Sequence, residues 1–115
     1  MSAETRAATA AAVAVVAVSL DEGEVVQCAV GCRFRGADGA VVLTEHRLVV
    51  ANARSFDPDV VTIGLEPGLG VQGWQDGQAA ALVFERNGHE LVVDRIIDRD
   101  LARELTTEVR RRVEH

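Results

Sequence analysis

The stretch LVFERNGHELVVDRIIDRDLARELTTEVRRRV, residues 82–113, changes its hydrophobic spacing near Asp98. Before Asp98, two apolar runs flank Asn87 and Gly88, the pair most typical of a two-residue β-hairpin turn because both residues tolerate a positive φ. After Asp98, apolar residues recur at every fourth position, at Leu101, Leu105, Val109 and Val113. That spacing predicts an amphipathic helix, with Asp98 as its N-cap and the arginines of residues 110–112 in its last turn. The stretch therefore predicts a sheet that ends in one C-terminal helix.

Upstream of this stretch, short apolar runs alternate with turn residues. The sequence GAVVLTEHRLVVAN, residues 39–52, predicts a hairpin in which Thr44 bonds the backbone of the bend. We expect the next three side chains, Glu45, His46 and Arg47, to be satisfied by solvent. Further runs at residues 60–65, 69–74, 79–86 and 89–94 read as strands separated by loops and turns. Together with Val26–Phe34, these runs predict seven short strands.

Strict alternation marks Val26–Phe34 as a half-buried strand, with Val26, Cys28, Val30, Cys32 and Phe34 on its apolar face. The sequence RGADGA that follows, residues 35–40, supplies Gly36, Asp38 and Gly39 as turn residues and predicts the turn into the next strand. Four residues of strand separate the two cysteine sulfurs by about 13 Å, which is beyond disulfide reach. Packing of both thiols in the core is favoured over metal or redox chemistry, and reduced cysteines fit a cytoplasmic protein.

Composition narrows the class of protein. The chain has 115 residues, a length typical of one domain, and 48% of them are hydrophobic. Its formal charge is −6, and all 12 basic residues are arginine. The net negative charge repels phosphate backbones and anionic lipid headgroups. We therefore expect no nucleic-acid binding, and membrane-lipid binding is disfavoured.

The N-terminal residues 1–19 are alanine-rich, and residues 7–18 are apolar. We interpret this segment as a retained helix that packs on the domain of residues 20–115 or on a second copy. The run is too short to span a bilayer as a helix. The alternative is a signal peptide, in which case the protein is exported and not cytoplasmic.

Seven short antiparallel strands followed by one helix resemble the pleckstrin-homology (PH) superfold, in particular small bacterial PH-like and GRAM-like domains. The matching segments are LDEGEVV at residues 20–26, AVVLTEHRLVVAN at residues 40–52 and LVFERNGHELVVD at residues 82–94. The resemblance implies an α+β, mainly β fold: a partly open barrel of two packed sheets, plugged at one end by the C-terminal helix. PH domains that bind inositol lipids carry several basic residues around the first hairpin, whereas only Arg33 and Arg35 could serve here. Many PH domains also carry a Trp in the final helix, and Trp74 lies outside it.

Residues that could carry chemistry are sparse. His46 and His89 stand at predicted hairpin corners without a metal-ligand spacing, and no serine lies in a nucleophile turn. The sequence therefore predicts a non-enzymatic chain without a cofactor or metal. Trp74, beside the predicted turn at residues 75–78, either covers the barrel as a lid, which we favour, or anchors a partner.

The expected function is an interaction module that binds a protein partner or a second copy, with Trp74, Arg33 and Arg35 as the candidate surface. The alternative is a small-molecule or lipid-binding domain that uses the mouth of the barrel.

Overall fold

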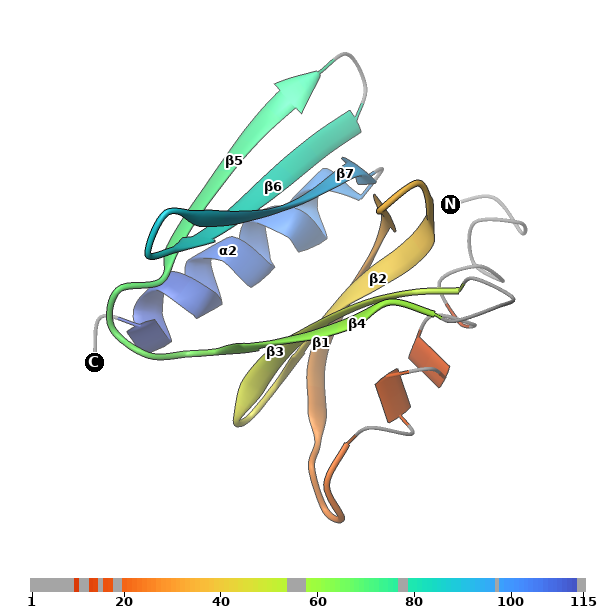
Figure 1. Cartoon of the computed structure of the whole chain (residues 1–115), viewed down its shortest axis with the longest axis vertical. Helices are drawn as coiled ribbons and strands as arrows, with labels where there is room; N and C mark the ends of the chain where they lie inside the picture. The colour runs from red at the N-terminus through yellow and green to blue at the C-terminus, as the bar shows by residue number, and fades with distance from the viewer. Residues whose placement is uncertain are drawn as a thin grey trace.

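The computed structural model describes residues 10, 13–14, 16–17, 20–53, 58–76, 79–96 and 98–113. Seven antiparallel strands are followed by one C-terminal helix (Figure 1). The elements are β1 (Val26–Phe34), β2 (Ala37–Thr44), β3 (Arg47–Asn52), β4 (Val60–Gly64), β5 (Gly70–Asp76), β6 (Ala79–Arg86), β7 (His89–Ile96) and α2 (Arg99–Val113). The mainly β, α+β fold predicted from the sequence is confirmed.

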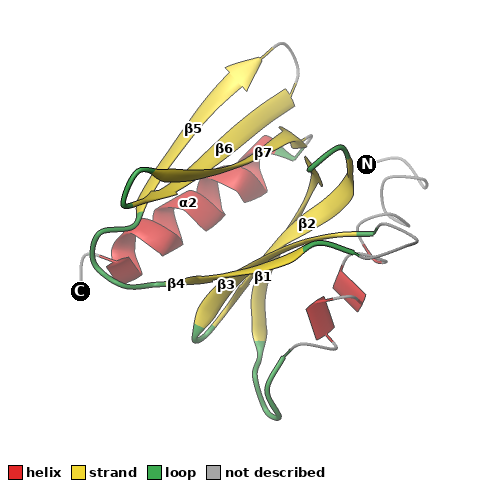
Figure 2. Ribbon diagram, viewed as in Figure 1, coloured by secondary structure: helices red, strands yellow, loops and turns green. Residues whose placement is uncertain are grey.

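The strands follow the order β4-β3-β2-β1-β7-β6-β5 in one sheet. The link between β1 and β7 is short, since Arg33 opposite Asp94 is the one registered pair between them. The sheet therefore divides into two layers, β1–β4 and β5–β7, which diverge away from this link (Figure 2). Helix α2 packs against β1, β5 and β6, so it lies across the interior of the partly open sheet.

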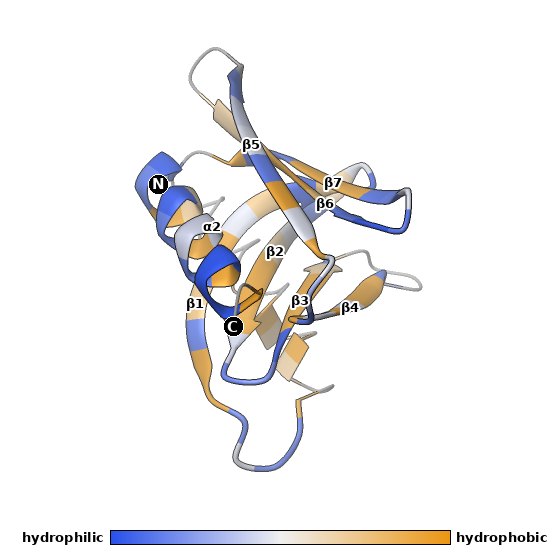
Figure 3. Ribbon diagram, turned by 90° about the vertical axis from the view of Figure 1, so that its left-hand side faces the viewer, coloured by the Kyte–Doolittle hydropathy of each residue, from blue (hydrophilic) through white to orange (hydrophobic). Residues whose placement is uncertain are grey.

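The buried side chains form two hydrophobic clusters. The larger one lies between the sheet and α2 and includes Phe34, Leu48, Phe84 and Leu105, all almost fully buried. The smaller one lies on the opposite face of β2 and β3, where Ala40, Val42, Val49 and Ala51 pack with Val16. Both faces of β2 and β3 are therefore buried, and these strands carry continuous apolar runs (Figure 3).

The N-terminal segment covers that second face where it is described. Residues 10, 13–14 and 16–17 are helical, and Val16 is fully buried among the small side chains of β2 and β3. Packing on the chain's own domain was one of the two arrangements expected of this segment. The remaining positions of residues 1–19 lie outside the described residues. None of the described helices is long and apolar enough to span a membrane.

The turn between β1 and β2 is tighter than the sequence suggested. Phe34 pairs with Ala37, and the two loop residues Arg35 and Gly36 have φ values of 51° and 79°. Such a left-handed pair matches the right-handed twist of a hairpin. The prediction that Asp38 and Gly39 form the turn was wrong, since both lie within β2. Position 39 requires glycine because the backbone of β3 is so close that a Cβ atom would lie 2.4 Å from the Ala51 carbonyl oxygen.

The predicted face of β1 was wrong at its first residue. The register of β1 against β2 shifts between Val26 and Cys28, and such a bulge interrupts the alternation of side chains. Val26 is consequently 40% exposed, while Val30, Cys32 and Phe34 remain buried as expected.

Helix α2 begins and ends as the sequence predicts. The Asp98 carboxylate accepts a hydrogen bond from the Leu101 amide at 3.1 Å, which is an N-cap contact. Leu105 and Val109 are fully buried, and the arginines of residues 110–112 occupy the last turn.

Candidate functional site

The polar corner between β2 and β3 is a structural junction. The Thr44 hydroxyl donates to the Glu24 carboxylate at 2.6 Å and accepts from the backbone amides of His46 and Arg47. Arg47 in turn donates through Nε and Nη2 to Glu24, at 3.1 and 2.9 Å. The expectation that solvent satisfies Arg47 was wrong, because its partner lies on the segment before β1, where the Glu24 side chain is 1% exposed.

Both ends of the domain meet at this corner. Hydrogen bonds from Arg47, from Thr44 and from the Asp21 amide lower the pKa of Glu24 to about 2. From the other side, Arg112 of α2 donates to the Thr44 carbonyl oxygen at 2.5 Å. Thr44 and Arg47 thus belong to the architecture of the domain, whereas the side chains of Glu45 and His46 are exposed, as expected.

A second polar network, called here the Asn52 network, lies at the opposite end of β2 and β3. Asn52 is fully buried, and its Nδ2 donates to the Phe34 carbonyl oxygen at 3.2 Å and to the Asp59 carboxylate at 2.9 Å. Its Oδ1 accepts the Asp59 amide at 2.9 Å. Asp59 also pairs with Arg35 at 3.2 Å, and the Arg35 guanidinium lies 4.9 Å from the centre of the Phe34 ring. The network therefore fixes the tip of the β1–β2 hairpin.

Beside this network opens a cleft of about 330 Å³ between β4 and the β6–β7 hairpin, named here the mouth cleft. Its apolar lining comprises Phe34, Val61, Ile63, Leu69, Phe84, Leu91 and Val92, and its charged lining comprises Arg35, Glu85, Arg86, His89 and Glu90. An apolar floor with charges of both signs around it suits the anchor side chains of a protein, or an uncharged organic group, better than a polyanion.

The strand beside the mouth cleft has a free edge. Strand β4 is the last strand in the sheet order and pairs with β3. The Asn52 amide donates to the Asp59 carbonyl oxygen at 3.0 Å, so by antiparallel alternation the backbone groups of Val60, Thr62 and Gly64 point away from β3. The Gly64 carbonyl, accepting from Arg86 at 2.8 Å, agrees with this direction.

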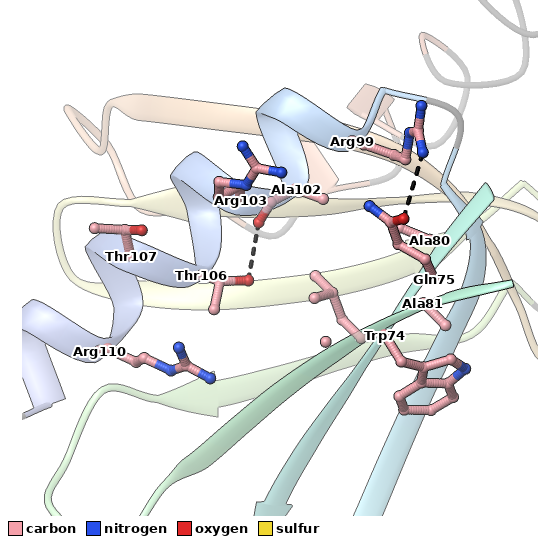
Figure 4. A pocket seen from close by; sticks show the side chains of 12 residues that line it. Trp74, Gln75, Ala80, Ala81, Arg99, Ala102, Arg103, Thr106, Thr107 and Arg110 are labelled. Atoms are coloured by element: carbon pink, nitrogen blue, oxygen red, sulfur yellow. Dashed lines mark hydrogen bonds between the residues drawn. The ribbon is translucent and has the colours of Figure 1, made fainter. Parts of the chain in front are cut away.

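A second cavity, of about 260 Å³, lies between α2 and the β5–β6 hairpin and is named here the α2 groove (Figure 4). Arg99, Arg103 and Arg110 line it from the helix, and Gly73, Gln75 and Leu82 are among its lining residues from the strands. Arg110 donates to the Val71 carbonyl oxygen of β5 at 2.7 Å, and Arg99 reaches the Gln75 side-chain oxygen at 3.5 Å.

The three residues expected to form one interaction surface are divided between these places. Arg33 donates to the Gly36 carbonyl oxygen at 2.9 Å within its own hairpin. Arg35 lines the mouth cleft, whereas Trp74 lines the α2 groove and is 48% exposed. The Trp74 ring points away from α2 (Figure 4). Its two roles, lid and anchor, both stay predictions.

The cysteines lie where the alternation placed them. Both thiols are free, and burial raises the pKa of Cys32 to about 12, with Asp94 and Asp38 adding to the shift. Within the part of the chain that the structure describes, no group of three or more His, Cys, Asp or Glu side chains could hold a metal ion.

Comparison with known proteins gives no relative: no protein family, curated protein or solved structure matches the chain. The two cavities and the free edge of β4 are therefore the features of the chain that bear on its function.

Proposed function

We propose that the chain is a non-catalytic interaction module of the PH-like class that binds an extended segment of a protein partner along β4. The observation that carries the proposal is the free edge of β4 directly beside an apolar cleft. The order of seven antiparallel strands and one C-terminal helix supports the PH-like class.

The recognition mode follows from strand geometry. An added strand would pair with the outward backbone groups of Val60 and Thr62, and its side chains would alternate between the two faces of the sheet. Val61 and Ile63 line the mouth cleft, so partner side chains on their face would enter the cleft. Main-chain hydrogen bonds would supply affinity, and the apolar floor would select the anchor residues.

The rim of the cleft adds a constraint on the partner. Arg86 donates to the carbonyl oxygens of Gly64, at the end of β4, and of Glu66, and Asp59 pairs with Arg35. Because Asp59 offsets Arg35 and the lining contains Glu85 and Glu90 as well as Arg86, the described lining of the cleft has no excess of positive charge. We therefore expect a segment of alternating apolar residues without a requirement for acidic ones.

Selection from a displayed library of random nine-residue peptides tests the proposal. Selected peptides should share an alternating apolar pattern and shift the amide resonances of β4. Thr62→Pro removes a backbone N–H that faces the free edge, so it should leave the β3 ladder intact while weakening peptide binding at least about tenfold, the equivalent of one to two lost hydrogen bonds. Thr62→Val keeps the N–H and is the matched control.

Two other outcomes discriminate the remaining possibilities. If the purified chain dimerises by light scattering and Thr62→Pro makes it monomeric, the partner segment is β4 of a second copy. If no peptide binds and a small molecule retained in native mass spectrometry shifts the amide resonances of Val61 and Ile63, the mouth cleft is a ligand pocket and the interaction module is refuted. The volume of about 330 Å³ lies at the lower end for such pockets.

A further inference from the structure

The acidic residues of α2 and its groove-lining arginines lie on different faces of the helix. Its acidic residues Asp100, Glu104 and Glu108 are spaced four apart, and none of them lines the α2 groove. The groove-lining arginines Arg99, Arg103 and Arg110 lie on another side of the helix. The described lining of the groove contains neither Asp nor Glu, in a chain whose formal charge is −6.

The arginines on the two sides of α2 also differ in their partners. Arg111 and Arg112 both form ion pairs with Glu108, at 2.5 and 3.0 Å. Arg99 and Arg110 are engaged by the neutral oxygens of Gln75 and Val71. Among the described residues no carboxylate pairs with Arg99, Arg103 or Arg110, so their positive charge is uncompensated inside the groove.

The acidic residues of the helix are directed elsewhere. Glu108 is held by Arg111 and Arg112. Glu104 lies near β1, since its charge adds to the burial that raises the pKa of Cys28. The hydroxyl of Thr107 on α2 and the side-chain amide of Gln75 on β5 are neutral donors in the lining of the groove.

We propose that the α2 groove binds the phosphate group of a soluble small molecule. Guanidinium groups bind phosphate oxygens in bidentate geometry, and a dianion matches the uncompensated charge of the three arginines. A cavity of about 260 Å³ accommodates a phosphate with a small organic body. The net negative charge of the chain opposes approach to an anionic membrane, which favours a soluble source over a lipid headgroup.

The site is independent of the proposed partner interaction. The α2 groove and the mouth cleft share no lining residue. Moreover, Arg110 occupies a carbonyl oxygen of the β5 edge, so this side of the sheet is less open to strand addition than β4 is. Thr62→Pro should consequently leave phosphate binding unchanged, and failure of either proposal would be recognised separately.

The test is a titration of the full chain with inorganic phosphate and with pyrophosphate at constant ionic strength. Binding is followed by the amide and arginine Nε resonances. We expect saturable shifts confined to residues of the groove. Arg103→Ala should weaken binding about tenfold, as loss of a charge-assisted hydrogen bond does. Arg111→Ala removes the same charge from the same helix outside the groove and should change the affinity less than twofold.

A second variant keeps the test decisive. Thr107→Glu places a carboxylate among the arginines on an exposed helical position, and it should abolish phosphate binding by occupying the site. Linear shifts spread over arginines outside the groove, or equal affinities for Arg103→Ala and Arg111→Ala, would overturn the proposal. Binding to phosphatidylserine vesicles without any response to free phosphate or pyrophosphate would overturn the assignment to a soluble ligand.

Discussion

Removal of the Asn52 side chain should be among the most damaging single changes in the domain. Asn52→Ala deletes three hydrogen bonds, which join the Asn52 side chain to the Phe34 carbonyl oxygen, the Asp59 carboxylate and the Asp59 amide. A neutral hydrogen bond contributes about 0.5–1.5 kcal/mol and one to a charged group about 1.5–3 kcal/mol, so the free energy of unfolding should fall by about 2–5 kcal/mol. That loss is a large share of the roughly 5–15 kcal/mol that holds a domain folded.

Urea unfolding followed by circular dichroism measures this change, and the melting temperature should fall by about 8–20 °C for a chain of this size. Thr106→Val is the matched control. The Thr106 hydroxyl donates to the carbonyl oxygen of Ala102 within α2, and its removal should leave no buried polar group without a hydrogen bond. A double-mutant cycle with Asp59→Ala should give a coupling free energy of at least about 1 kcal/mol. A cost for Asn52→Ala no larger than that of Thr106→Val would refute the reasoning.

Three further predictions concern acid stability, close packing and thiol reactivity. The pKa of Glu24 is lowered from 4.5 to about 2, so the ionised carboxylate stabilises the folded chain fully above pH 4.5, and this contribution is lost as the pH falls towards 2. The unfolding free energies of the wild type and of Glu24→Gln should therefore differ most near pH 7 and converge near pH 2. Gly39→Ala should destabilise by about 1–3 kcal/mol because its Cβ would overlap the backbone of β3, whereas Gly70→Ala, whose Cβ would have ordinary contacts, should show no comparable loss in thermal melts. Cys32, with a pKa of about 12, should be alkylated at pH 8 only as fast as the chain unfolds, and the half-buried Cys28 should react sooner. Peptide mass spectrometry measures both alkylation rates, and equal rates would contradict the deeper burial of Cys32.

Hydrophobic spacing was sufficient to predict the strands and the helix, because periods of two and of about 3.6 residues are local properties of the chain. It failed where the backbone departs from regularity. The bulge after Val26 turns that side chain outward, and the two-residue turn at Arg35 and Gly36 places Gly39 inside β2. Neither departure alters the spacing of apolar residues along the chain, so neither can be predicted from that spacing.

Burial of both faces of β2 and β3 did have a signal in the sequence. The runs AVVL and LVVA are continuous and not alternating, which is typical of strands covered on two sides. An alanine-rich segment upstream, with Val16 as its buried member, supplies the second cover. Small side chains at Ala40 and Ala51 leave room for that close approach.

The candidate sites were less accessible to sequence reasoning. The mouth cleft brings together β1, β4, β6 and β7, and their side chains meet only after the sheet has divided into two layers. The α2 groove had a partial signal, since arginines at positions 99, 103 and 110 share a helix face that lacks the acidic spacing of Asp100, Glu104 and Glu108. Which strand faces those arginines depends on tertiary packing.

The two polar networks explain how the domain can be stable and still have an unpaired strand edge at β4. One network is at Thr44 and the other at Asn52, near opposite ends of the β2–β3 hairpin. Eight residues of β2 at about 3.4 Å each place its ends roughly 24 Å apart. Only the Asn52 network borders the mouth cleft, through Arg35 and Phe34. Loosening the Thr44 corner should thus cost stability without reshaping the cleft, whereas loosening the Asn52 network should disturb both, because it holds the arginine at the rim.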